Sequence, residues 1–264
     1  MTEVLLGTVA IEPNRWGTVT PDRSPVTRLA SWLDTIADAG FDGLEVWDGH
    51  LTKADAADAD AIADGSLPVP VLNSYADFGP GGEAAAARVV AARWARRIGA
   101  RAVKFNVGND PVDESGYVER IATWLDALPG DTVALCECHQ GISIAEIPAV
   151  AARIFEQAGA AERVQALVHT HDEPDLVRAK FDAYGERITH VHVNFLDFGA
   201  MQHPTLASCA DRLADFHALV TGLGFAGSWT LEFVAGLLTD RDEPGALLEQ
   251  AAADLPVLRS VLDG

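Results

Sequence analysis

The segment AGFDGLEVW (residues 39–47) contains the pattern that decides the fold. A helical stretch ends at Gly40, and glycine directly after a helix is typical of the left-handed cap that ends it. The short apolar run from Gly43 to Trp47 follows within a few residues. Such a run, bounded by turn residues, is typical of a strand buried on both faces. The segment therefore predicts a helix that leads into a strand of a parallel sheet.

The same unit of helix, glycine and short apolar strand recurs along the chain. Its other instances are IGARAVKF (98–105), LPGDTVALCE (128–137), AERVQALVH (161–169), YGERITHVHV (184–193) and LGFAGSWTLEF (223–233). The segments LLGTVAI (5–11) and PVPVLNSY (68–75) add two more strands. The predicted strands begin near Val4, Gly43, Val69, Ala102, Thr132, Val164, Thr189 and Ser228. Their spacing of about 25 to 40 residues is the length of one βα unit.

Eight such units within 264 residues predict one (β/α)8 TIM barrel that spans residues 1–264 as a single α/β domain. The alternative is an open, doubly wound sheet, which usually carries a glycine-rich phosphate loop after its first strand. The loop EPNRWGTVTPD (12–22) lacks that pattern and favours the barrel. Helix starts are predicted at Ser24-Pro25 and at Ser143, where Glu146 completes a capping box.

Composition excludes several classes of protein. The formal net charge of −20 argues against a nucleic-acid partner, which is bound by clustered Lys and Arg. No apolar run reaches the roughly 18 residues of a membrane span. The N-terminus does not have the pattern of a signal peptide, and three cysteines make no disulfide framework. A cytoplasmic location is the expectation.

In a (β/α)8 barrel the active site lies at the carboxyl ends of the strands, so the residues that end each strand are the candidates. Polar residues gather there, and those after the last four strands are mainly Glu and His. In chain order the candidates are Glu12, Asn14 and Trp16; Glu45; Asn73; Lys104 and Asn106; Glu137 and His139; His169, His171 and Asp172; His190, His192 and Asn194; and Glu232.

The glutamates and histidines of the last four strands suggest a metal site. Side chains alternate between the faces of a strand, so Glu137 is expected to share a face with His139, and His169 with His171. Four inward side chains, one from each strand, can then meet at one point. Two carboxylates and two imidazoles form a mixed oxygen and nitrogen ligand set, which suits a divalent ion such as Mn, Co, Zn, Fe or Mg.

The chain resembles a known family. The segments FDGLEVW (41–47), ALCECHQG (134–141), ALVHTHDEP (166–174), HVHVNF (190–195) and WTLEF (229–233) are similar in order and spacing to motifs of the xylose isomerase-like TIM barrels, the sugar phosphate isomerase/epimerase family. This family includes ketose 3-epimerases, hydroxypyruvate isomerase, inosose isomerase and dehydratase, and endonuclease IV. The resemblance covers nearly the whole chain.

The resemblance implies one divalent metal ion, with Mn favoured over Co, Zn and Mg. It implies Glu137, His192 and Glu232 as ligands, and it places His169 where the family usually has an aspartate. Asp172 stands where the family usually has a histidine, so the strand-six ligand remains open among His169, His171 and Asp172. Replacement of a carboxylate by an imidazole favours a softer metal.

The resemblance also implies a reaction, the transfer of a proton beside a carbonyl group through an enediolate. Glu137 and Glu232 are the expected catalytic pair, and His139 is expected to contact the substrate. Lys104 is expected either to polarise a substrate oxygen or to pair with Glu137 or Glu45, and pairing is favoured. The other expected substrate-binding residues are Glu45, Asn73, Trp16, His171 and Asp172.

The expected substrate is a small carbohydrate. The loop after strand seven, NFLDFGAMQHP (194–204), has no Arg or Lys to bind a phosphate, so we expect an unphosphorylated sugar, polyol or keto acid. An isomerase or epimerase is preferred, with an inosose-type dehydratase or lyase as the alternative. A metal-free binding subunit with the same fold is a further alternative, and the net charge argues against an endonuclease. Relatives are often dimers or tetramers, so a homo-oligomer is an expectation from the resemblance.

Overall fold

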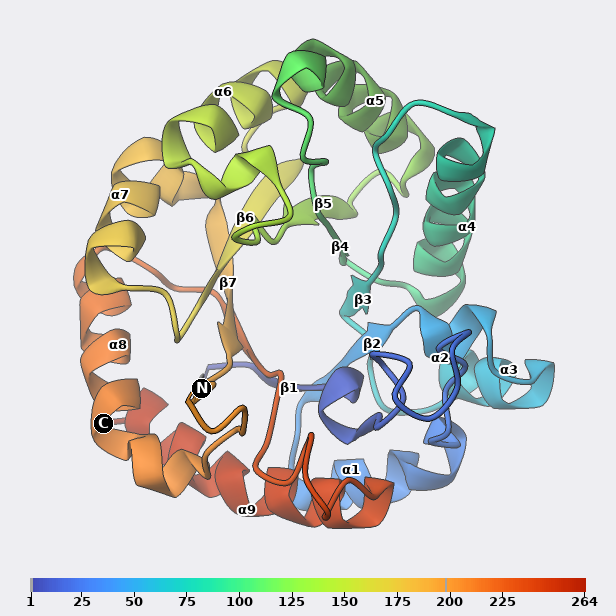
Figure 1. Ribbon diagram of the computed structural model, residues 1–264, viewed down its shortest axis with the longest axis vertical. Coiled ribbons are helices and arrows are strands. Elements are labelled where there is room, and N and C mark those ends of the chain that lie inside the picture. Colours follow the sequence, from blue (N-terminus) through green and yellow to red (C-terminus); the bar gives the residue numbers. More distant parts are fainter. Residues whose placement is uncertain (1, 198) are drawn as a thin grey trace.

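Eight parallel strands close into a barrel in the computed structural model, which describes residues 2–197 and 199–264. The strands follow one another around the barrel in sequence order, and helices surround them on the outside (Figure 1). Because β1 pairs with β8 as well as with β2, the sheet has no free edge. The predicted (β/α)8 barrel is confirmed, and the open doubly wound sheet is excluded.

The strands begin within two residues of their predicted positions. Their bounds are β1 Val4–Gly7, β2 Gly43–Trp47, β3 Val71–Asn73, β4 Ala102–Phe105, β5 Val133–Cys136, β6 Val164–His169, β7 Ile188–Val193 and β8 Ser228–Leu231. The short apolar runs fold as strands because both of their faces are buried, one against the helices and one inside the barrel.

The α-helices connect the strands on the outer side of the barrel. Their bounds are α1 Leu33–Ala39, α2 Gly49–Thr52, α3 Ala56–Asp64, α4 Gly82–Ile98, α5 Glu114–Ala127, α6 Pro148–Ala158, α7 Pro174–Tyr184, α8 Ala210–Gly222 and α9 Pro244–Leu262. Gly40 and Gly99 end α1 and α4 in the left-handed conformation, with φ of 96° and 66°. This confirms the left-handed caps at these two helix ends, whereas Gly185 after α7 has a φ of −54° and is not left-handed.

One predicted helix start is wrong. No helix begins at Ser24-Pro25; residues 12–28 form a loop, and α1 begins at Leu33 after a 3-10 turn. The reason is that the carboxylate of Glu12 accepts the backbone N–H groups of Val26 and Thr27, each at 3.1 Å, and holds this segment as part of the loop. Ser143 does act as a cap, but for a short 3-10 turn, Ile144–Glu146, that precedes α6.

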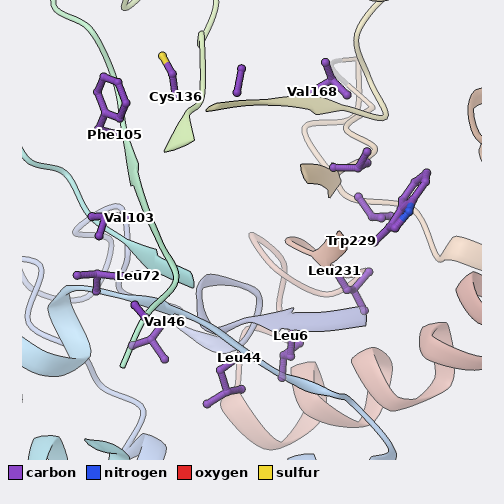
Figure 2. Close-up of a cluster of buried hydrophobic side chains, with 14 of the residues drawn as sticks. Leu6, Leu44, Val46, Leu72, Val103, Phe105, Cys136, Val168, Trp229 and Leu231 are labelled. Atoms are coloured by element: carbon purple, nitrogen blue, oxygen red, sulfur yellow. The ribbon is translucent and has the colours of Figure 1, made fainter. Parts of the chain in front are cut away.

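The core has two layers that follow the alternation of side chains along the strands. Outward side chains of the strands pack against the helices in one large cluster, and Figure 2 shows part of it, including Leu44, Leu72, Phe105 and Trp229. The inward residues at about mid-height form a small apolar cluster of Leu5, Val71, Ala102, Leu135 and Leu167. Leu167 pairs in register with His190 of β7, so a polar side chain also lies at this level, two residues before His192.

Membrane insertion receives no support from the helices. Within residues 2–197 and 199–264, none of them combines the length and the apolar composition that crossing a bilayer requires.

Gly227 is a position where the barrel tolerates no side chain. It directly precedes β8, and a Cβ atom there would overlap the backbone carbonyl of Thr189 in β7. We therefore expect Gly227→Ala to lower the free energy of unfolding by about 2–3 kcal/mol, because the backbone must shift to relieve the overlap. Gly222→Ala is the matched control: a Cβ there meets nothing within 4 Å. Urea unfolding measures both, and equal stability of the two variants would contradict the prediction.

Candidate functional site

Four side chains from the last four strands meet at the carboxyl end of the barrel. Glu137 directly follows β5, His169 ends β6, His192 lies in β7 and Glu232 directly follows β8. Each offers one oxygen or nitrogen atom, and these four atoms lie within 4.8 Å of one another. The strand pairing places His169 opposite His192. The structure thus brings together the four residues that the sequence singled out.

The distances within this cluster show that its polar atoms face a common centre. His192 Nδ1 lies 3.3 Å from Glu232 Oε1 and 4.0 Å from Glu137 Oε1. His169 Nε2 lies 3.4 Å from the same Glu137 oxygen. All four residues are at most 4% exposed. Among the described residues, His192 Nδ1 has no hydrogen-bond partner although it is fully buried.

The orientation of His192 is set from behind by Glu45. The His192 Nε2–H donates to Glu45 Oε2 at 3.0 Å, so that Nδ1 faces the centre of the cluster. The other oxygen of Glu45 accepts a hydrogen bond of 2.9 Å from the Asn73 amide, and His190 Nε2 lies 3.2 Å from Oε2. A carboxylate behind an imidazole is the arrangement that orients histidine ligands in metalloproteins. In this structure Glu45 and Asn73 support the cluster from beneath it.

The two carboxylates of the cluster are held in the same way. Glu137 Oε2 accepts from the Asn106 amide at 2.7 Å, and Glu232 Oε2 accepts from the Asn194 amide at 3.1 Å. Each carboxylate therefore keeps its Oε1 turned toward the centre. Lys104 Nζ lies 2.8 Å from Glu137 Oε2, which confirms the expected pairing of this lysine. Asn106 and Asn194 directly follow β4 and β7, but their role beside the carboxylates was visible only in the fold.

The charges of the cluster compensate one another. Burial alone would lower the pKa of His192, but the carboxylates of Glu232 and Glu45 outweigh it and raise this pKa to about 10. Burial would raise the pKa of Glu232, and the charge of His192 instead holds it below its ordinary value. The pKa of Glu137 is lowered well below its ordinary value, because Lys104 and His169 overcome the effect of burial. Both carboxylates are thus ionised at neutral pH.

The donor set fits one divalent cation. Two carboxylate oxygens and two imidazole nitrogens converge in a buried position, and a further hydrogen bond orients Glu137, His192 and Glu232. Two other groups of potential ligands overlap with this one. The first group is Glu45 with His190 and His192, and its carboxylate already accepts hydrogen bonds from both rings. The second group is His169, His171 and Asp172, and its carboxylate already pairs with Lys180.

The end of strand six shows which of its three candidates faces the cluster. His169 faces the cluster. Asp172 instead turns to Lys180 of α7, and it accepts hydrogen bonds from the lysine ammonium at 2.7 Å and from the His169 backbone N–H at 3.1 Å. His171 lies beside His169, with ring centroids 4.7 Å apart, and its Nδ1 is 3.1 Å from the Asn194 carbonyl. Burial, together with His169, lowers the pKa of His171 to about 4.

His139 lies at the exposed rim, with its ring 6.3 Å from that of His169. Strand alternation does not position His139, because β5 already ends at Cys136 and Cys138 has a φ of 50°. This left-handed residue redirects the chain between Glu137 and His139. Cys136 and Cys138 lie in the outer core, with their sulfurs 3.6 Å apart.

Aromatic residues and Arg15 lie beside the cluster. Trp16 packs against Phe233, the residue after Glu232, with ring centroids 5.4 Å apart. Phe195, an aromatic residue in the loop after β7, is buried beneath Arg212. Arg15 is buried between the rings of Trp16, Tyr75 and Phe233. Sequence reasoning named Trp16 but missed Arg15, because nothing in the loop distinguished it from Arg23 or Arg28.

The buried pair of Asp172 and Lys180 gives a test of how the strand-six end is held. Asp172→Asn should lower the free energy of unfolding by about 3–5 kcal/mol at pH 7, since it leaves the Lys180 ammonium buried without a partner. Adding Lys180→Met should recover much of the loss, because neither charge then remains. Urea unfolding of the two single variants and the double variant measures this.

The same pair predicts a dependence on pH. Burial would raise the pKa of Asp172, but Lys180 lowers it below its ordinary value. Its contribution to stability is therefore fully present above about pH 4, where free aspartate is ionised, and is lost as the pH falls through the lowered pKa. The stability difference between the wild type and Asp172→Asn should shrink on acidification. A difference that does not change with pH would contradict the role of this ion pair.

Comparison with known proteins supports the fold. No protein-family model and no curated protein matches the chain. Similar solved structures include a xylose isomerase domain protein from Alicyclobacillus acidocaldarius, 18% identical with a TM-score of 0.66 over 100% of both chains. A xylose isomerase-like TIM barrel protein from Mycobacterium smegmatis, in complex with magnesium, is 14% identical with a TM-score of 0.63, covering 99% of this chain and 98% of that one.

The probable 3-DHS dehydratase AsbF from Bacillus anthracis is also similar. It is 12% identical with a TM-score of 0.67, over 100% of this chain and 99% of that one. At these identities the comparison shows the fold: the chain has the architecture of the xylose isomerase-like TIM barrels.

Proposed function

We propose that this protein is a divalent-metal-dependent isomerase or epimerase that acts on an unphosphorylated keto sugar or related polyol by proton transfer through an enediolate. The observation that carries the proposal is the buried convergence of two carboxylates and two imidazoles at the carboxyl ends of β5–β8. The similar structures support it, because one of these barrels was solved with magnesium and another is named a probable dehydratase.

Glu137, His169, His192 and Glu232 are the residues that would hold the metal ion. The mixed oxygen and nitrogen set favours Mn, with Co, Zn and Mg as alternatives. When bound, the ion would stabilise the negative charge that develops on the substrate oxygens as the enediolate forms. Removal of a metal ligand should therefore weaken binding of the ion without unfolding the barrel.

Glu137 and Glu232 are the proposed acid–base pair. Both are ionised, as a base must be, and both direct one carboxylate oxygen toward the centre. One carboxylate would remove the carbon-bound proton and become a carboxylic acid, and the other, after taking a proton from the solvent, would return it to the substrate. Return to the neighbouring carbon gives isomerisation, and return to the same carbon from the opposite face gives epimerisation.

Residues around the rim are the proposed substrate contacts. His139, Trp16 and His171 lie around the cluster and remain predicted substrate-binding residues. Lys104 pairs with Glu137, and we propose that its positive charge would also polarise a substrate oxygen. The hydrogen bonds of Glu45, Asn73 and Asp172 join them to residues of the protein, so we propose that these three position the cluster.

Three alternatives use the same fold. Loss of a β-hydroxyl from the enediolate would make the protein a dehydratase or lyase. A barrel without metal would act as a binding subunit. Hydrolysis of nucleic acid is disfavoured, because a net charge of −20 repels a phosphate backbone. We propose a small carbohydrate as the partner and a cytoplasmic location.

Metal loading separates the enzyme from the metal-free subunit. After Mn loading and desalting, the wild type should retain about one equivalent by elemental analysis. His192→Ala should bind Mn at least about tenfold more weakly, since it removes a ligand nitrogen. His217→Ala is the control, because His217 packs against Trp229 in the helix layer. Retention of less than about a tenth of an equivalent by the wild type would favour the metal-free subunit.

Deuterium incorporation tests the reaction. Incubation of the Mn-loaded protein with a panel of ketoses and inososes in deuterated water should label the α-carbon of the true substrate. Glu137→Gln should slow this exchange at least about 100-fold, because the variant lacks the base. Glu83→Gln, at an exposed position in α4, is the matched control. Exchange at the wild-type rate in Glu137→Gln would show that another group removes the proton.

A further inference from the structure

The loop after β1 holds Arg15 in a defined position. Glu12 Oε1 accepts the backbone N–H groups of Asn14 at 2.8 Å and Val26 at 3.1 Å. Asn14 Oδ1 accepts those of Val19 at 2.8 Å and Thr20 at 2.9 Å. Glu12 and Asn14 are both fully buried. Two buried side chains thus organise the loop from inside, so the residue that follows Asn14 is positioned by more than its own contacts.

Arg15 is buried without a carboxylate partner. Its residue is 9% exposed, and no Asp or Glu among the described residues lies within 4.0 Å of its guanidinium. Its Nε donates to the Tyr75 hydroxyl at 3.0 Å, and its Nη2 donates to the same oxygen. The guanidinium carbon lies 5.0 Å from the ring centroids of both Trp16 and Phe233. A buried guanidinium normally has an anionic partner, because burying an unpaired charge is costly.

The surroundings of Arg15 connect it to the four-residue cluster. Phe233 directly follows Glu232, and the Tyr75 ring lies 5.5 Å from Lys104 Nζ, which pairs with Glu137. Burial opposes the charge of Arg15, but Tyr75 and Glu232 outweigh it and raise its pKa. The guanidinium is therefore a permanent positive charge beside the proposed reaction centre.

We propose that Arg15 binds a carboxylate group of the substrate, and that the substrate is a keto sugar acid. This inference rests on the proposed function, whose substrate class it narrows. A guanidinium fork matches the two oxygens of a carboxylate. The rings of Trp16 and Phe233, each with its centroid 5.0 Å from the guanidinium carbon, flank Arg15. Arg15 thus supplies, from the β1 loop, the anion-binding group that the β7 loop lacks.

A carboxylate fits this position better than a phosphate does. Phosphate sites usually combine several Lys or Arg side chains with the N-terminus of a helix. Near Arg15 the second cation is Lys104, and its ammonium already pairs with Glu137. One planar guanidinium beside two aromatic rings is therefore suited to a flat, singly charged anion.

Binding of matched sugars tests the proposal. 2-Keto-D-gluconate and D-fructose differ at C1, where the first has a carboxylate and the second a hydroxymethyl group. In calorimetric titrations of the Mn-loaded protein, we expect 2-keto-D-gluconate to bind about 10- to 100-fold more tightly than D-fructose, the usual effect of a hydrogen bond to a charged group. D-Fructose 1-phosphate is the third probe and should bind more weakly than the acid.

Variants of Arg15 identify the group responsible. Arg15→Gln should abolish the preference for the acid while Mn binding and the affinity for D-fructose stay unchanged, and Arg15→Lys should retain part of the preference. Arg23→Gln, at an exposed position in the same loop, should behave as the wild type. Failure of the wild-type protein to bind Mn would instead overturn the proposed function.

Three results would overturn the inference about Arg15. The first is that 2-keto-D-gluconate binds no more tightly than D-fructose, which includes no binding of either sugar. The second is that D-fructose 1-phosphate is the tightest ligand of the three. The third is that Arg15→Gln weakens the acid and the neutral sugar equally. The comparison of the three sugars on the wild-type protein decides the question even if the variants fail to fold.

Discussion

The burial of Glu137 and Glu232 as charged groups is the constraint on which the rest of the site depends. An ionised carboxylate inside a barrel is stable only when neighbouring charges and hydrogen bonds compensate for its lost hydration. Lys104 supplies a positive charge beside Glu137, and the amides of Asn106 and Asn194 donate to the outward oxygens of the two carboxylates. Because these groups occupy one side of each carboxylate, the other oxygens converge on a single point.

The barrel provides this arrangement through strand order. Neighbouring strands β5 to β8 end side by side, so the residues at their carboxyl ends lie next to one another. Glu45 reaches His192 from β2, across the barrel from the strands that carry the cluster. The loop after β1 then brings Arg15 over the same end. Proton chemistry at the centre and recognition of an anion at the rim would thus be divided between different elements.

Much of the fold and part of the site could be read from the sequence. The recurrence of glycine followed by a short apolar run located the strands, because helix caps and doubly buried strands are local features. Glu137, His169, His192 and Glu232 could be singled out because each lies at or near the end of such a strand. The β1 loop was harder, since Ser24-Pro25 has the local pattern of a helix start while the distant Glu12 binds the adjacent backbone.

The sequence by itself determined the barrel and the strand ends that carry its polar residues, because both depend on periodicity and caps within a few residues. Only the tertiary structure decided the partners. It assigned Glu45 to His192, turned Asp172 toward Lys180 and buried Arg15 among three aromatic rings. These contacts join residues that are far apart in the chain or lie in irregular loops, so closure of the barrel and packing of the loops had to bring them together.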